Sequence, residues 1–272
     1  MSIVYACAGS HAPGIRAWAD AAPSDQLERF FSGYEETRDA LAAAKPDAIL
    51  LLTSEHWANF FLDHVGAFCL GRGESFEGPV EPWLKVEKST VPGHPEVAEA
   101  ILNRCYAEGF ELNYSHELKL DHGSMVPLSF LTPGMDIPVV PLFFNTLMTP
   151  RPTARRCLEL GRVLRPLLAE LPQRIAVVAT GGLSHDPGEV GHGRIDTDFD
   201  NRFLQTITGG DLNALGAYTD EEILAAGAGT LELLAWICLA GVMEGTESRV
   251  VAYEPIKPWA TGVGVISYDK VA

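Results

Sequence analysis

Hydrophobic residues along the chain gather in short, nearly continuous runs, and longer segments with apolar residues at helical spacing lie between them. Runs rich in β-branched residues predict strands that are buried on both faces, as in a sheet covered by helices. These runs are Ile3–Ala8, Ala48–Thr53, Pro138–Phe144, Ile175–Thr180, Arg249–Tyr253 and Gly262–Tyr268. The predicted helices are Ser24–Ala44, Pro95–Glu108, Pro152–Leu171, Asp198–Thr208 and Thr230–Met243.

This alternation of strands and helices predicts an α/β fold with a mainly parallel or mixed central sheet flanked by helices. The segment Phe68–Pro92 breaks the alternation, because it is rich in Gly, Pro and Glu, and it is expected to be a long loop or an extra hairpin. No linker or internal repeat divides the sequence, so we expect a single α/β domain over residues 1–272. Ligands of such sheets bind beyond the carboxyl ends of the strands, where the site is therefore expected.

Composition and charge narrow the class of protein. The chain is 47% hydrophobic and 21% charged, which is typical of a globular protein and excludes intrinsic disorder. Its 20 basic and 36 acidic residues give a net charge of −16, which argues against nucleic-acid partners and anionic membrane surfaces. No run reaches the roughly 20 apolar residues of a membrane span, and the N-terminal apolar run lacks the basic residues of a signal peptide. Five cysteines without paired spacing indicate free thiols in a reducing cytoplasm.

Three of the eight histidines lie three to five residues after the end of a predicted strand. His11 follows the first strand, His56 follows the second, and His185 follows the strand Ile175–Thr180. Small residues surround His11 and His185, and they permit sharp turns and close approach of the backbone. We therefore expect the three histidines to meet at the carboxyl edge of the sheet.

Two further residues add candidate chemistry. His122 lies beside Asp121, a carboxylate that can orient an imidazole ring and raise its basicity. Glu232 lies in an otherwise apolar predicted helix, where an acid must be paired, protonated or bound to a metal. The alternative for Glu232 is an ordinary acid in a first helical turn, with Thr230 as the N-cap.

Two histidines and one carboxylate form the ligand set of non-haem Fe(II) oxygenases, which leaves coordination positions open. The same donors also hold Zn²⁺ with a water molecule for hydrolysis, so the ligand types alone leave both metals open. No glycine-rich GxGxxG motif follows a strand, which argues against a nicotinamide or flavin cofactor.

An ordered set of short motifs resembles the class III extradiol ring-cleavage dioxygenases, the LigB superfamily that includes the protocatechuate 4,5-dioxygenase β subunit. The motifs are Ser10–Pro13, Ser54–Phe61, Asp121–Gly123, Pro138–Leu142, Gly181–His185 and Glu232–Trp236. Single motifs are weak, but their order over most of the chain is specific to this family. Two positions depart from it: Glu55 stands where a relative has Asp, and Leu231 stands where some members have a polar residue.

The resemblance implies that His11, His56 and Glu232 bind Fe(II), that His122 and His185 act as acid and base, and that Asp121 assists them. It implies cleavage of an aromatic ring beside two adjacent hydroxyls, or a hydroxyl and an amine, with both atoms of O₂ inserted. The substrate is thus expected to be a small aromatic diol or aminophenol. Which of the two acid–base histidines acts first is left open.

The resemblance also raises expectations about the surroundings of the site. Trp57, Phe60 and Phe61 are candidates for the walls of an aromatic pocket, but we expect at least one of them to pack in the core instead. If the substrate carries a carboxylate, Arg16 and Lys257 are weak candidates to meet it, because most such side chains are solvated at the surface. We expect a homo-oligomer, alone or with a related or small α subunit. Two other functions compete with the dioxygenase: a Zn²⁺-dependent hydrolase with the same ligands, and a non-catalytic partner subunit, which the intact ligand set disfavours.

Overall fold

A computed structural model describes residues 2–188 and 190–268. Ten strands are present in this part of the chain. They are β1 (Ile3–Gly9), β2 (Ala48–Ser54), β3 (Phe68–Gly71), β4 (Ser75–Gly78), β5 (Ser89–Pro92), β6 (Asn113–Ser115), β7 (Val139–Phe144), β8 (Ile175–Thr180), β9 (Ser248–Ile256) and β10 (Thr261–Tyr268).

Nine α-helices and three short 3₁₀ turns are described between these strands. The helices are α1 (Gly14–Ala17), α2 (Ser24–Ala44), α3 (Pro95–Ala107), α4 (His122–Leu131), α5 (Ala154–Glu170), α6 (Thr197–Thr208), α7 (Leu212–Ala217), α8 (Asp220–Ala225) and α9 (Leu233–Val242). The 3₁₀ turns are η1 (Ala19–Ala21), η2 (Ala228–Glu232) and η3 (Lys257–Trp259).

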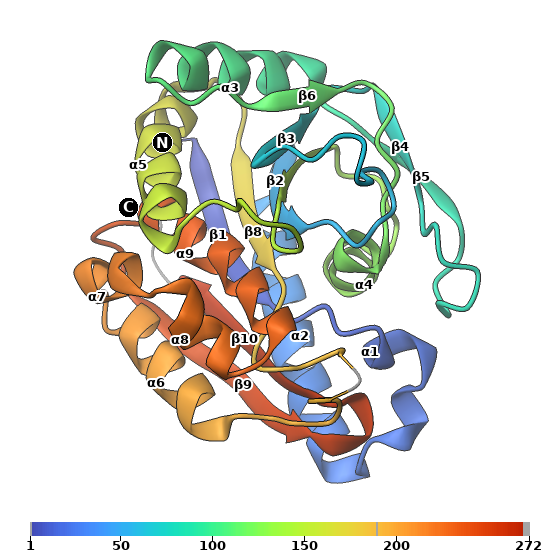
Figure 1. Cartoon of the computed structure of the whole chain (residues 1–272). Coiled ribbons are helices and arrows are strands. Elements are labelled where there is room, and N and C mark those ends of the chain that lie inside the picture. Colours follow the sequence, from blue (N-terminus) through green and yellow to red (C-terminus); the bar gives the residue numbers. More distant parts are fainter. Residues whose placement is uncertain (1, 189, 269–272) are drawn as a thin grey trace.

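Eight of the strands form one central sheet in the order β6-β3-β7-β2-β8-β1-β10-β9 (Figure 1). The four inner strands β7, β2, β8 and β1 are parallel, whereas β10 is antiparallel to both of its neighbours, β1 and β9. Every residue of β2, β7 and β8 is buried, which explains why these strands are continuous apolar runs. The predicted mixed α/β fold is therefore confirmed.

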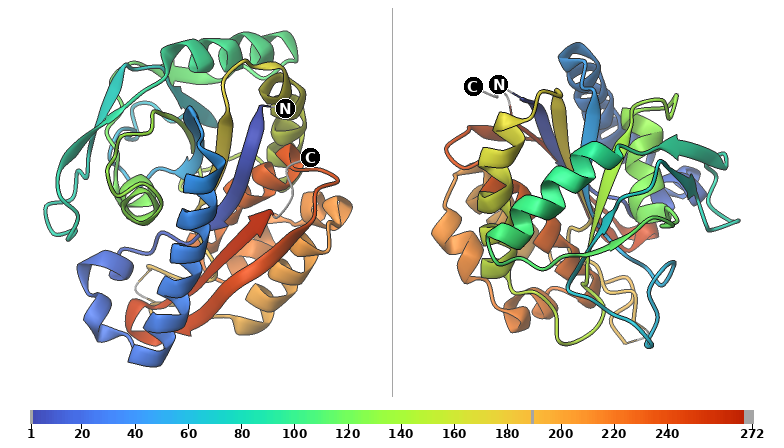
Figure 2. Two further views of the ribbon diagram at one scale, coloured as in Figure 1. Left: turned by 180° about the vertical axis from the view of Figure 1, so that it is seen from behind. Right: turned by 90° about the horizontal axis from the view of Figure 1, so that it is seen from above.

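Helices cover both faces of the sheet. One apolar core includes residues of α3, α5, α6 and α9, and the second core, on the other face, includes residues of α2 and α4 (Figure 2). Helix α9 is buried at every position, and it packs mainly on α5 and β8. No helix in the described ranges is long and apolar enough to span a membrane.

The predicted elements recur with small shifts at their ends, and the differences concern the site. Helix α2 has the predicted bounds, and Pro95 stands in the first turn of α3. The predicted helix Thr230–Met243 begins instead with the 3₁₀ turn η2, so Glu232 lies at the junction of η2 and α9. Thr230 makes no capping bond there. The segment Phe68–Pro92 contains the extra hairpin β4–β5, together with strand β3, which joins the main sheet.

Candidate active site

Three side chains from distant parts of the chain converge at the carboxyl edge of the parallel strands. His11 follows β1, His56 follows β2, and Glu232 precedes α9. The Nε2 atom of His11 lies 3.0 Å from Oε2 of Glu232, and the Nε2 atom of His56 lies 2.9 Å from Oε1. His11 and Glu232 are buried, and the His56 side chain is 18% exposed. The carboxylate of Glu232 thus lies between two imidazole nitrogens.

The second ring nitrogen, Nδ1, of His11 and of His56 forms a hydrogen bond on the side of the ring that faces away from Glu232. His11 Nδ1 lies 3.0 Å from the hydroxyl of Thr180, the last residue of β8. His56 Nδ1 lies 3.0 Å from Oδ2 of Asp121, and the same oxygen accepts the backbone N–H of His56 at 3.0 Å. Such contacts fix the tautomer of a histidine and leave Nε2 to face the common centre.

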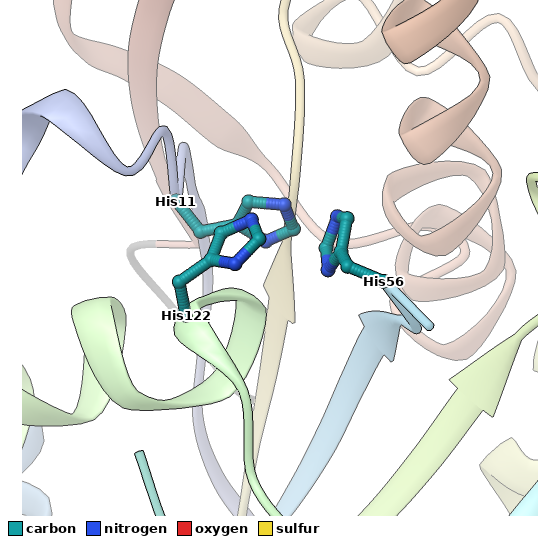
Figure 3. Close-up of side chains that lie close together, drawn as sticks. All are labelled: His11, His56 and His122. Atoms are coloured by element: carbon teal, nitrogen blue, oxygen red, sulfur yellow. The ribbon is translucent and has the colours of Figure 1, made fainter. Parts of the chain in front are cut away.

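His122, the first residue of α4, faces the same centre from the other side. Its ring lies 4.1 Å from the His56 ring and 5.6 Å from the His11 ring, centroid to centroid (Figure 3). Asp121 was expected to orient this ring, but it bonds His56 instead. The carboxylate beside His122 is Glu81, whose Oε1 lies 2.6 Å from Nδ1. Adjacent residues at a helix start point in different directions, which explains the error.

His185 completes the set on the side of Glu232. Its Nε2 lies 3.8 Å from Oε1 of Glu232, and its Nδ1 donates to the backbone carbonyl of Leu183 at 3.0 Å. A Cβ atom on Gly229 would lie only 2.0 Å from His185 Nε2. A glycine is therefore required where the chain passes this ring. All five site residues from the sequence motifs lie in this region, with Asp121 behind His56.

Glycine is also required at the start of α4. A Cβ on Gly123 would lie 2.9 Å from Cε1 of His56 and 3.2 Å from Cε1 of His11. Real side chains rarely approach that closely, so an alanine would push the two rings apart. Gly123 lets α4 begin directly against the two histidines that follow β1 and β2.

The pKa values of Glu232, His56 and Asp121 are shifted by the charges of their neighbours in the site. Burial favours the neutral form of Glu232, but the charges of His11 and His185 and the hydrogen bonds from the rings outweigh it and hold its pKa well below the ordinary value. Burial likewise lowers the pKa of His56, but Asp121 and Glu232 outweigh it and raise that pKa well above normal. Burial opposes ionisation of Asp121, yet His56 brings its pKa down to about 2.

His122 behaves differently from His56. Its burial and the nearby charge of His56 lower its pKa, although the hydrogen bond to Glu81 opposes them. The ring of His122 is therefore neutral near pH 7, and a neutral ring can accept a proton.

The residues present fit a metal ion. The Nε2 atom of His11 is buried and forms no hydrogen bond of good geometry within residues 2–188 and 190–268, despite its closeness to Glu232. Two such nitrogens and a carboxylate oxygen are the donors that a divalent first-row metal takes on one face. A second set is also possible, because ring nitrogens of His11, His56 and His122 lie within 4.8 Å of one another.

The surroundings of the site match only part of the expectations. Trp57 and Phe60 line a narrow pocket with Phe143 and Met148 that none of the site histidines lines, and Phe61 is 53% exposed. Arg16 bonds the side chain and backbone of Ser129 and lies over the ring of Phe130 at 3.6 Å. Its guanidinium is therefore engaged away from the histidines, and Lys257 is exposed on η3.

Sequence reasoning assigned no role to three residues that support the site. Thr180 ends a strand, Glu81 lies in the β4–β5 hairpin, and Glu55 precedes His56. The carboxylate of Glu55 accepts backbone N–H bonds from Trp57, Ala58, Asn59 and Phe60, and it thus shapes the loop after β2. The Glu at position 55 was noted only as a departure from a relative. Of these three residues, Thr180 could have been found from the sequence, because it ends a predicted strand at the edge of the sheet where the site was expected.

Comparisons with known proteins identify the family of the chain. A family model described as the catalytic LigB subunit of aromatic ring-opening dioxygenase matches residues 5–264. The chain is 26% identical over 309 aligned positions to 2,3-dihydroxyphenylpropionate/2,3-dihydroxicinnamic acid 1,2-dioxygenase from Escherichia coli strain K12, with 95% of this chain and 96% of the relative covered. The protein of the same name from Shigella sonnei matches equally. The crystal structure of the uncharacterized protein JW3007 from Escherichia coli K12 shares the fold, with a TM-score of 0.62, 18% identity, and coverage of 97% of this chain and 99% of that one.

Proposed function

The chain belongs to the family of the catalytic LigB subunit of aromatic ring-opening dioxygenases, and from this premise we propose that it is an Fe(II)-dependent enzyme that cleaves a catechol or an aminophenol. As a member it is an extradiol ring-cleavage dioxygenase. We propose His11, His56 and Glu232 as the iron ligands. The observation that carries this assignment is the position of the Glu232 carboxylate, 3.0 Å and 2.9 Å from the two Nε2 atoms.

His11, His56 and Glu232 would hold Fe(II), which would bring the substrate and O₂ together and let electrons pass between them. The residues around it perform the proton chemistry. A catechol must lose protons in order to chelate, and the neutral ring of His122 is suited to accept one. A proton must be returned when the ring opens, and His185, 3.8 Å from Glu232, is the second group in reach.

Asp121 acts in this proposal through His56. Its carboxylate holds both the backbone N–H and Nδ1 of that residue, so His56 presents Nε2 to the metal.

Two tryptophans lie near the ring of His122. The ring of Trp83 lies 6.2 Å from the His122 ring and 6.1 Å from the Trp18 ring, centroid to centroid. Both tryptophans are half-exposed, and we propose them as walls for the aromatic ring or its substituent.

The experiment is oxygen uptake by protein that has been loaded anaerobically with Fe(II). A panel of catechols, gallate and aminophenols identifies the substrate class, and one O₂ consumed per ring lost is the expected stoichiometry. A panel without any oxygen uptake, measured with one iron bound per chain, would contradict the proposal.

A second candidate is a zinc enzyme that activates water. It is favoured by the grouping of His11, His56 and His122, since three histidines with an open fourth position form a known catalytic zinc site. Metal analysis of the protein purified from its own host separates the two: iron with oxygen uptake supports the dioxygenase, and zinc without it supports the hydrolase.

The assembly and location of the protein follow as further proposals. We propose a reducing, cytoplasmic location, supported by five cysteines that are all free and buried. The match to a catalytic subunit disfavours a non-catalytic partner role. Formation of a homo-oligomer, alone or with a related or small α subunit, stays a prediction that sedimentation of the purified chain tests.

A further inference from the structure

The β4–β5 hairpin, residues Ser75–Pro92, lies outside the main sheet and yet reaches the site through one side chain. Glu81, between its two strands, has a side chain that is only 13% exposed. Its Oε1 atom lies 2.6 Å from Nδ1 of His122 and accepts the backbone N–H of the same residue at 3.0 Å. Its Oε2 atom is buried and has no hydrogen-bond partner within the described part of the chain.

The same arrangement occurs at His56. There, one oxygen of Asp121 receives both the backbone N–H and Nδ1, each at 3.0 Å. A carboxylate that takes both groups of one histidine holds its main chain and ring together, so the ring cannot turn independently. The protein thus builds this clamp twice, once from Asp121 and once from the hairpin.

We propose that Glu81 is a positioning residue that fixes His122 with its proton on Nδ1 and its lone pair on Nε2. Oε1 of Glu81 already accepts the backbone N–H of His122, and the same oxygen accepts from the ring, so Nδ1 is the donor. The remaining nitrogen, Nε2, is then an acceptor directed at the side of the ring where His11 and His56 lie. This inference rests on the proposed function, because it matters to catalysis only if His122 exchanges a proton with substrate.

The tautomer is the property on which this role depends. If the proton moved to Nε2, His122 would present a donor to the centre and could not accept a hydroxyl proton there. Glutamine at position 81 is nearly isosteric, but its amide can accept from Nδ1 or donate to it. Glu81→Gln therefore removes the constraint on the tautomer while it preserves the shape of the hairpin.

The test uses full-length, metal-free protein with ¹⁵N-labelled histidine, because Zn²⁺ bound at Nε2 of His122 would itself fix the tautomer. The His122 signals are assigned by their loss in His122→Ala, and one- and two-bond ¹H–¹⁵N couplings report the tautomer. We expect a single Nδ1–H form in the parent and a mixed or Nε2–H form in Glu81→Gln. In the Fe(II) enzyme, Glu81→Gln should lower kcat about 10- to 100-fold with unchanged iron content, as is usual for partners of active-site histidines.

Glu77→Gln is the matched control. Glu77 belongs to the same hairpin, but its side chain is 65% exposed and lies 3.6 Å from Lys88. This variant should keep both the tautomer and kcat. If Glu81→Gln retains the Nδ1–H form, or if its iron content falls in step with kcat, the positioning role is overturned. If the tautomer changes but no substrate is ever cleaved, the positioning of the ring is supported and the proposed function fails instead.

Discussion

The hydroxyl of Thr180 lies 3.0 Å from Nδ1 of His11, and it joins three segments of the chain at that point. It also lies 2.8 Å from the hydroxyl of Thr53 at the end of β2, and 2.9 Å from the carbonyl oxygen of Gly123 in α4. All of these atoms are buried. The orientation of His11 therefore depends on a single oxygen at the end of a neighbouring strand.

Replacement of that oxygen should weaken metal binding. Thr180→Val keeps the shape of the side chain but removes the acceptor for Nδ1, and loss of such a partner typically costs 10- to 100-fold in metal affinity. The unfolding free energy should also fall by about 1–3 kcal/mol, because buried polar groups lose their partner. Titration of the metal-free protein with Fe(II) measures the affinity.

Thr37→Val provides the control for that experiment. Thr37 is equally buried, and its hydroxyl donates to the carbonyls of Gly33 and Tyr34 within the same helix, α2. It should lose stability without any loss of iron affinity. Equal iron affinities of the two variants would show that Thr180 does not orient a metal ligand.

Two variants distinguish Glu232 from His122 as the third metal ligand beside His11 and His56. With the carboxylate set, Glu232→Ala should lose most bound iron, because only two ligands remain and the negative charge is gone. His122→Ala should keep the iron, since His11, His56 and Glu232 are intact. Iron per chain after desalting is the measurement. The reverse result, with iron lost from His122→Ala and kept in Glu232→Ala, would favour the three-histidine set.

The sheet could be predicted from the sequence because its inner strands are continuous apolar runs. Burial of both faces of a strand is enough to produce such a run, so no knowledge of distant contacts is needed. His11 and His56 could be placed for the same reason, since each follows its strand directly. Helix α4 was not predicted, because it is short, apolar on all sides and contains Pro127, so it has no helical pattern.

The partners of the histidines were not predictable in the same way. The bond between Glu81 and His122 depends on how the β4–β5 hairpin folds against α4, which no local pattern encodes. Proximity in sequence led to a wrong prediction for Asp121, which precedes His122 in the chain but forms its hydrogen bond with His56. Long-range contacts of this kind required the folded chain.

His185 should matter for turnover and not for iron retention. Its Nε2 lies 3.8 Å from a carboxylate oxygen of Glu232, and we assign it to proton transfer. His185→Ala should retain Fe(II) and bind a catechol anaerobically, while kcat falls about 10²- to 10⁴-fold. His192→Ala, at an exposed histidine of the same connection, should leave kcat unchanged. Full activity of His185→Ala, or its loss of iron, would refute the assignment.

Asp200 on α6 supports the turn that carries His185, because it binds Ser184, the residue before it. Its carboxylate accepts the backbone N–H and the hydroxyl of Ser184, each at 2.8 Å, and the hydroxyl of Tyr253 at 2.8 Å. Burial favours the neutral form more strongly than these bonds favour the charge. The pKa of Asp200 therefore rises to about 6.

The raised pKa of Asp200 predicts how stability depends on pH. The folded protein holds this proton more tightly than the unfolded chain, whose carboxyl titrates near 4, so the stabilisation is complete below about pH 4 and is lost as pH rises through about 6. Asp200→Asn cannot titrate there. The unfolding free energy of the parent should therefore fall relative to Asp200→Asn by about 2 kcal/mol between pH 4.5 and 7.5, measured by urea denaturation. Asp198→Asn, at an exposed position of the same helix, should follow the parent at every pH. A constant difference between the parent and Asp200→Asn would mean that Asp200 is ionised throughout.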